Sequence, residues 1–170
     1  MPRVQLIEER DQASAAQIEV FDHIAASRGG RMIRPYAAML HRPEIARAAA
    51  DLGAVIRFES TIGDRIRELA IVTTAIERKC DFEWASHSPL ARDAGVSEAT
   101  LDAIRGGVAV TGRDAIIVDF ARALCRSGEV DDTTFNNAAD ELGEDGVVEL
   151  AAVVGYYSML ALFMKACDVC

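Results

Sequence analysis

The placement of proline constrains the fold of this chain more than any other feature, because proline interrupts regular helices. The 170-residue sequence has four prolines, at positions 2, 35, 43 and 89, so residues 90–170 contain none. This proline-free segment is rich in alanine, leucine and glutamate, which favour helix. The chain shows no alternating strand pattern bounded by turn signals. We therefore expect an all-α protein.

Cap and turn residues divide the chain into a series of expected helices. Asp64 and Ser97 are expected N-caps, and Gly95 is an expected helix stop. The expected helices cover residues 6–26, 35–40, 43–59, 65–79, 81–94, 98–105, 115–126, 133–142 and 147–166.

The first expected helix stands apart from the others. It is charged and moderately amphipathic, and the glycines at positions 29 and 30 supply a hinge after it. No internal repeat or low-complexity segment is found in the sequence. We therefore expect an N-terminal arm helix within residues 1–30, able to pack on a neighbouring subunit, and one helical domain over residues 31–170.

Charge and hydropathy restrict the partners of this protein. The net charge is −9 and the basic residues are scattered, which argues against nucleic acid as a partner. The most apolar stretch, residues 150–164, is too short to span a bilayer, and the N-terminus lacks the apolar core of a signal peptide. We therefore expect a cytoplasmic protein that neither enters a membrane nor binds nucleic acid.

The four cysteines are expected to be reduced thiols, because a chain of this size is not a small disulfide-held scaffold. They are Cys80, Cys125, Cys167 and Cys170. The last two have the spacing of a redox pair, but they stand on the final four residues, where chains commonly fray. We expect them to be an incidental pair of thiols.

One segment gathers residues that carry chemistry. Cys80, Glu83 and His87 are spaced by three and four residues, so a helix would align them along one stripe. Glu68 lies twelve residues before Cys80, on the preceding apolar helix, and is expected to face the same pocket. Charged groups on otherwise apolar helices require partners, since an unpaired buried charge is costly.

Spacing alone leaves other interpretations of this segment open. Glu83 and His87 form a surface salt bridge in one alternative, with Cys80 as a small core residue. A zinc site is another, but no third ligand is evident nearby, so no metal is expected. Trp84, the only tryptophan, is a candidate to line a substrate pocket, although core packing is the more common role of such a residue.

Five pieces of the sequence, in order over more than a hundred residues, resemble the carboxymuconolactone decarboxylase / alkylhydroperoxidase-D-like family. The resemblance extends over residues 35–164 and implies an AhpD-like helical bundle that assembles as a homo-oligomer, either a trimer or a hexamer. The pieces are LHRPE at 40–44, RELAI at 67–71, FEWASH at 82–87, LARDAGVS at 90–97 and VGYYSMLA at 154–161.

The branch of the family depends on one position. In the peroxidase branch, the site motif resembles a Glu followed by eleven residues, then Cys-x-x-Cys, three residues and a His. This chain is similar to that motif in keeping Glu68, Cys80 and His87 at those spacings. Glu83 stands where the second cysteine would be, so the CxxC redox pair is lacking. The aromatic-Glu-Trp-x-x-His motif of the decarboxylase-like branch matches residues 82–87 instead. Lys79 departs from the small, helix-breaking residue expected at its position.

The resemblance therefore implies a cofactor-independent lyase that decarboxylates a small carboxylated lactone or oxo acid. His87 would donate a proton or stabilise the developing oxyanion, Glu83 would carry or relay the proton, and Glu68 would orient His87. Cys80 lies at the same site, and Trp84 is the candidate for substrate binding. Two alternatives remain: an alkylhydroperoxidase-like thiol peroxidase that uses Cys80, and a non-catalytic oligomeric ligand-binding protein.

Overall fold

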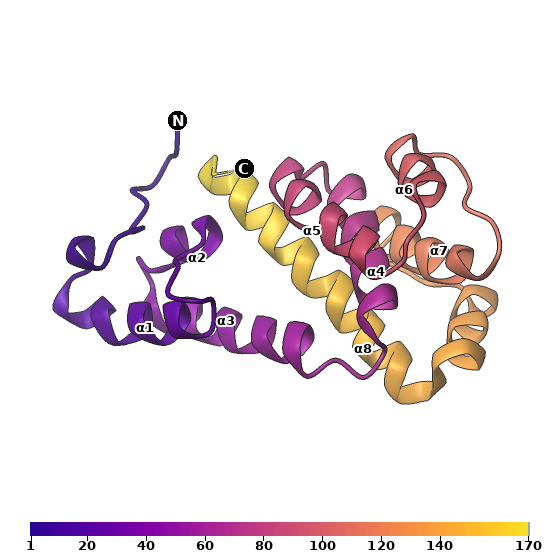
Figure 1. Cartoon of the computed structure of the whole chain (residues 1–170), viewed down its shortest axis with the longest axis horizontal. Coiled ribbons are helices and arrows are strands. Elements are labelled where there is room, and N and C mark those ends of the chain that lie inside the picture. The colour runs from indigo at the N-terminus through magenta and orange to yellow at the C-terminus, as the bar shows by residue number, and fades with distance from the viewer. Residues whose placement is uncertain (170) are drawn as a thin grey trace. The chain divides into compact units, whose positions relative to one another are not determined.

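The computed structural model describes residues 1–169. Its regular elements in that range are all helices, joined by loops, and it contains no strand there (Figure 1). The prediction of an all-α protein is confirmed. Its elements are the 3-10 helix η1 (Arg10–Gln12) and the helices α1 (Ala15–Ala26), α2 (Arg34–Met39), α3 (Pro43–Phe58), α4 (Asp64–Glu77), α5 (Asp81–Asp93), α6 (Glu98–Arg105), α7 (Arg113–Arg126) and α8 (Asp132–Cys167).

The chain divides into two compact units. Unit 1 comprises Met1–Glu59 and Phe163–Cys170, and unit 2 comprises Ser60–Leu162. The helices α1, α2 and α3 therefore share one unit. The boundary predicted at residue 30, between an arm helix and a helical domain, falls within that unit. Every candidate site residue named from the sequence lies in unit 2.

In unit 1, α1 and α2 both pack against α3. The buried face of α1 includes Phe21 and Ile24. The predicted helix over residues 6–26 is wrong at its start, because α1 begins only at Ala15. The reason is local: the backbone amide of Ser14 donates to Oε1 of Gln17 at 2.9 Å, a capping interaction that starts the helix there.

In unit 2, α4 is the central helix and packs against α5, α6 and α7. Its sequence reflects that position, since nine consecutive residues from Arg67 to Ala75 are buried. The hydroxyls of Thr73 and Thr74 donate to the carbonyls of Leu69 and Ala70, each at 2.8 Å, so these polar groups are satisfied inside the helix. A helix buried on nearly all sides can hold charged side chains only where partners meet them.

The turn between α4 and α5 places the end of one site helix next to the start of the other. Lys79 has a φ of 52°, in the left-handed region that favours glycine. The amide of Lys79 donates to the carbonyl of Ile76 at 2.9 Å, and that of Cys80 donates to the carbonyl of Ala75 at 2.8 Å. These two bonds form the Schellman pattern that ends a helix. The departure at Lys79 therefore leaves the helix-breaking turn intact.

The other end of α4 differs by one residue from the prediction. Its N-cap is Gly63, and Asp64 is the first helical residue rather than the cap. The carboxylate of Asp64 accepts a hydrogen bond from Nη1 of Arg67 at 2.9 Å. By contrast, the predictions at Ser97 and Gly95 are confirmed: Ser97 caps α6, and Gly95 has a φ of 88° just after α5.

The last helix, α8, is broken at Gly143, whose φ of 74° and ψ of 170° are not helical. The two helices predicted over residues 133–142 and 147–166 correspond to the segments on either side of this break. The segment after the break is apolar: α8 is long and apolar enough to cross a membrane by length and composition, and 56% of its most apolar window is buried in the protein. A core helix of a soluble protein has the same properties, so this feature decides nothing about membranes.

Candidate functional site

The structure brings three predicted site residues together inside unit 2. Glu68 is contributed by α4, and Glu83 and His87 by α5. All three side chains are almost completely buried, with residue exposures of 2–4%. The alternative of a surface salt bridge between Glu83 and His87 is therefore excluded by their burial.

One carboxylate is fixed to one nitrogen of the histidine ring. Oε2 of Glu68 lies 2.6 Å from Nδ1 of His87, a short distance for a charge-assisted hydrogen bond. A carboxylate in this position accepts the Nδ1 proton and thereby fixes both the tautomer and the orientation of the ring. The structure thus brings Glu68 and His87 into contact, while a common pocket for the two residues stays a prediction.

The opposite edge of the ring faces the second carboxylate. Nε2 of His87 lies 3.6 Å from Oε2 of Glu83, which is an ion-pair distance but longer than a hydrogen bond. The ring of Tyr157 on α8 meets the imidazole edge to face, with centroids 5.0 Å apart and an interplanar angle of 82°. Tyr156 packs on Tyr157 in the same manner, at 5.4 Å. The ring of Tyr157, packed against Tyr156, therefore restricts the movement of the imidazole.

Arg67 is a site residue that sequence reasoning missed. Its guanidinium lies 3.3 Å (Nη2) and 3.4 Å (Nε) from Oε1 of Glu68, and both side chains are buried. A third nitrogen, Nη1, donates to the exposed carboxylate of Asp64. Adjacent residues on a helix point about 100° apart, so the spacing of Arg67 and Glu68 did not predict that their side chains meet. Only the need of a buried carboxylate for a cation indicated a partner of this kind.

Cys80 is buried beside the start of α5 rather than on its helical stripe. It is the N-cap of α5, with φ of −113° and ψ of 95°, and its side chain is almost fully enclosed. Glu83 is then the third residue of the helix, the position that faces the N-cap in capping interactions. The predicted common stripe is therefore correct for Glu83 and His87, whereas Cys80 lies in the turn before the helix.

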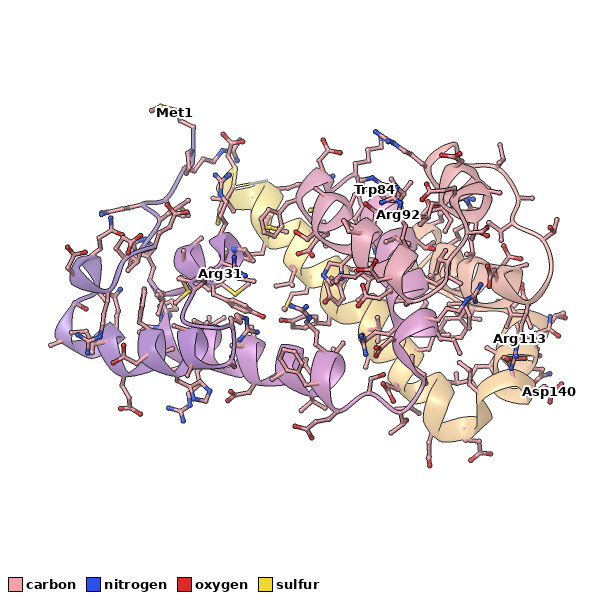
Figure 2. All side chains as sticks on the ribbon, viewed as in Figure 1. Met1, Arg31, Trp84, Arg92, Arg113 and Asp140 are labelled. Carbon is pink, nitrogen blue, oxygen red and sulfur yellow. The ribbon has the colours of Figure 1, made fainter. Side chains whose placement is uncertain are left out.

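Trp84 is directed differently from its neighbour Glu83. Its ring is partly exposed on α5 (Figure 2), and the guanidinium carbon of Arg105 lies 5.7 Å from the ring centroid. This is within the range of a cation–π contact between α5 and the end of α6. The contact describes a packing role for Trp84, and substrate binding by this residue stays a prediction.

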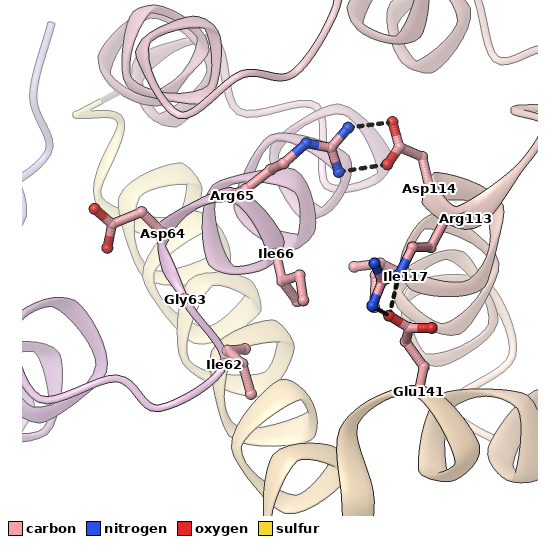
Figure 3. Close-up of a pocket in the computed structure, with 9 residues that line it drawn as sticks. All are labelled: Ile62, Gly63, Asp64, Arg65, Ile66, Arg113, Asp114, Ile117 and Glu141. Carbon is pink, nitrogen blue, oxygen red and sulfur yellow. Dashed lines mark hydrogen bonds and ion pairs between the residues drawn. The ribbon is translucent and has the colours of Figure 1, made fainter.

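A pocket described in unit 2 does not include His87 in its lining. It is a cavity of about 250 Å³ beside the start of α4, the start of α7 and the part of α8 that precedes Gly143 (Figure 3). Ion pairs Arg65–Asp114 and Arg113–Glu141 lie on two sides of it. Asp64 also lines it. Since opposite charges in its lining neutralise each other, its chemistry points to no particular ligand.

Within residues 1–169 no group of three or more histidine, cysteine, aspartate or glutamate side chains is arranged to hold a metal ion. Among the described residues, the cysteines at 80, 125 and 167 form no disulfide bond. Cys170, which is expected to form an incidental pair of thiols with Cys167, lies outside the described residues.

The site segment matches a known family. Residues 43–125 fit the model of the carboxymuconolactone decarboxylase family, and Glu68, Cys80, Glu83 and His87 all fall inside that range. Over this segment, just under half of the chain, the sequence is similar to the carboxymuconolactone decarboxylase family. No curated protein matches the sequence at a significant level.

Solved structures of peroxidase-related proteins and of a debrominase share the fold. An uncharacterised peroxidase-related protein with an alkylhydroperoxidase AhpD core, from Ralstonia eutropha, has a TM-score of 0.77 at 15% identity, covering 99% of this chain and 91% of that one. The debrominase Bmp8, as a cysteine-to-alanine variant in complex with 2,3,4-tribromopyrrole, has a TM-score of 0.75 at 18% identity, covering 99% and 92%. A peroxidase-related protein from a Silicibacter species has a TM-score of 0.75 at 16% identity, covering 98% and 90%.

These likenesses confirm the AhpD-like fold predicted from the sequence. They do not separate the activities found on it, because peroxidase-related proteins and a debrominase share the same architecture. The reaction must therefore be argued from the residues of this chain.

Proposed function

We propose that this protein is a cofactor-independent lyase that decarboxylates a small carboxylated lactone or oxo acid. The observation that carries the proposal is the environment of the His87 ring: Glu68 meets Nδ1 at 2.6 Å, and Glu83 stands 3.6 Å from Nε2. This arrangement places both ring nitrogens of a buried histidine beside carboxylates, which suits proton transfer to carbon.

The proposed reaction balances without an oxidant or a reductant. Cleavage of the bond between the carboxylate and its carbon releases carbon dioxide and leaves the electron pair on that carbon. A neighbouring carbonyl of the lactone or oxo acid delocalises the pair as an enolate or dienolate. One proton then adds to the carbon, so that one carboxylate and one proton give one carbon–hydrogen bond and one carbon dioxide.

Each site residue has a distinct part in this scheme. His87 supplies the proton from Nε2, and Glu83 exchanges that proton with Nε2. Glu68 accepts the Nδ1 proton throughout and stabilises the imidazolium when it forms. Solvent restores the proton after each turnover. Burial strengthens these electrostatic interactions by excluding water from between the charges.

A second candidate function is a thiol peroxidase that uses Cys80. The observation in its favour is the position of Cys80 at the N-cap of α5, because a helix N-terminus stabilises an anion such as a thiolate. Against it stands Glu83, which occupies the position of the second cysteine of the redox pair and cannot form a disulfide with Cys80.

The two functions are separated by one pair of assays. The wild type is incubated in D2O with a panel of carboxylated lactones and 3-oxo acids, and carbon dioxide release and product mass are measured. The proposal expects release of carbon dioxide with one deuterium on the carbon that lost it. Peroxide consumption with a thiol reductant is measured in parallel.

Two outcomes would contradict the proposal. Peroxide reduction that is lost in Cys80→Ser, without carbon dioxide from any panel member, would establish the peroxidase. Retention of a co-purified small acid that is never turned over would instead indicate a ligand-binding protein.

A further inference from the structure

Arg67 has a buried side chain, although arginine side chains are mostly exposed in proteins. Arg67 is the first buried residue of α4 and is 8% exposed. Its side chain turns back, so that two of its nitrogens approach Oε1 of the adjacent Glu68. Its third nitrogen is held by Asp64, whose side chain is 77% exposed. Arginine remains charged in proteins, so this buried cation must act on the carboxylate beside it.

The two oxygens of Glu68 consequently have separate partners. Oε1 faces the guanidinium of Arg67, and Oε2 faces Nδ1 of His87. A carboxylate held at one oxygen by a cation stays ionised and cannot rotate to exchange its oxygens. An ionised Oε2 is only an acceptor, so it requires a proton on Nδ1 of His87.

The charges of the cluster show what this arrangement accomplishes. Among the described contacts of the imidazole are Glu68 from α4, Glu83 from α5 and Tyr157 from α8, with Arg67 behind Glu68. Arg67 offsets the charge of Glu68 inside the protein, and Asp64 meets the same guanidinium at its exposed end. The ionised carboxylate of Glu68 then accepts only at Nδ1 of His87, so the Nε2 edge of the ring is the one that faces Glu83.

We propose that Arg67 is a positioning residue that sets the tautomer of His87. By fixing Glu68 as an anion, it keeps the proton of the neutral ring on Nδ1 and presents the lone pair of Nε2 toward Glu83. The tautomer is a property of the resting protein. Its consequence for catalysis, that Nε2 is the atom that gains and delivers the proton, rests on the proposed function.

The tautomer can be read without any substrate. The protein labelled with 15N-histidine is studied by long-range 1H–15N NMR at a pH where the rings are neutral, and the three histidines are assigned with His23→Gln and His41→Gln. The wild type is expected to show His87 as the Nδ1–H form. In Arg67→Met, Glu68 is free to rotate or to take up a proton, so the His87 signals should shift to a mixture containing the Nε2–H form.

Two further variants control the comparison. Arg65→Met removes an arginine from the same helix that pairs with Asp114 rather than Glu68, and it should leave the His87 signals unchanged. Arg67→Lys retains the charge and should retain much of the Nδ1–H form. If Arg67→Met does not fold, Asp64→Asn provides a milder test, because it releases only the exposed anchor of Arg67.

The outcomes separate this inference from the proposed function. Retention of a pure Nδ1–H form in folded Arg67→Met, or an equal shift in Arg65→Met, would overturn the role of Arg67. Where the decarboxylation assay succeeds, Arg67→Met should lower kcat and change the pH profile, with partial recovery in Arg67→Lys. A wild type without decarboxylase activity contradicts the proposed function alone, since the tautomer is measured in the absence of substrate.

Discussion

Nε2 of His87 and Oε2 of Glu83 lie 3.6 Å apart, one turn from each other on the same face of α5. Because this pair holds the transferable proton in the proposed reaction, His87→Ala and Glu83→Gln should each lower turnover by about 10²–10⁴-fold. Decarboxylation rates measure the effect, and circular dichroism should show an unchanged helical signal. His41→Ala, which removes an exposed histidine from unit 1, serves as the control. Near-normal activity in both site variants would show that the site has been wrongly assigned.

Cys80→Ser should retain most of the lyase activity. Serine is nearly isosteric with cysteine, and the thiol has no part in the proposed proton transfer. The rate of Cys80→Ser is compared with that of His87→Ala under the same conditions. A loss as large as that of His87→Ala would place the thiol in the reaction and favour a peroxidase-type mechanism.

Lys79→Gly should stabilise the protein slightly. A non-glycine residue in the left-handed region costs roughly 1–2 kcal/mol, and the greater chain entropy of unfolded glycine offsets about 0.5–1 kcal/mol of that cost. The free energy of unfolding from urea titration should therefore rise by up to about 1 kcal/mol. Ala94→Gly, at a right-handed C-cap, should lower it instead. Destabilisation by Lys79→Gly would mean that the lysine side chain contributes more than its backbone strain costs.

Glu149 should make stability depend on pH. Burial raises the pKa of its carboxyl, but the nearby side chain of Ser60, together with hydrogen bonds from the hydroxyl and amide of Thr61, outweighs that effect and leaves the pKa below its usual value. A depressed folded-state pKa adds stability above the unfolded-state pKa, and this stability is lost as the pH falls through the folded-state value.

Glu149→Gln should accordingly lower the free energy of unfolding by about 1 kcal/mol at neutral pH, with a difference that shrinks below about pH 4. Urea titrations at several pH values test this, with the exposed Glu144→Gln as control. An equal difference at all pH values would show that ionisation of Glu149 does not contribute.

Light scattering at micromolar concentration should show a homo-oligomer, with a trimer or a hexamer expected from the resemblance. The structure adds a reason, since apolar side chains of α3 that recur at helical spacing are 47–60% exposed: Ile45, Leu52, Val55 and Phe58. Soluble monomers rarely leave such a patch uncovered. Leu52→Asp and Phe58→Asp should shift the mass downward, whereas Val108→Asp, in a loop, should not. A single species of 18.4 kDa in the wild type would contradict the prediction.

The helices of unit 2 were predictable because their ends carry local signals. Ser97 and Gly95 act through their own backbone neighbours, so their effect on α5 and α6 does not depend on the rest of the fold. The start of α1 was missed because charged residues before Ser14 fit a helical pattern that the capping by Gln17 overrides. Gly143 was placed between two helices correctly, since its segment contains clustered turn residues.

The site was only partly predictable for the same kind of reason. Glu83 and His87 share a face of one helix, which spacing reveals, but the bond from His87 to Glu68 joins residues 19 positions apart. Its existence could be expected from the resemblance, whereas its length and the atoms involved could not. Arg67 was missed altogether, because a long side chain that folds back onto its neighbour escapes any rule based on helical periodicity.

The left-handed turn at Lys79 bears on how relatives of this protein are found. The turn is held by the amides of Lys79 and Cys80, which bond to carbonyls in the last turn of α4, and not by the choice of residue. A search pattern that demands a small residue between the two site helices would pass over such chains, although their backbones follow the same path. Ancestry among these proteins is therefore better traced through the positions at which their helices end than through the residue types at those positions.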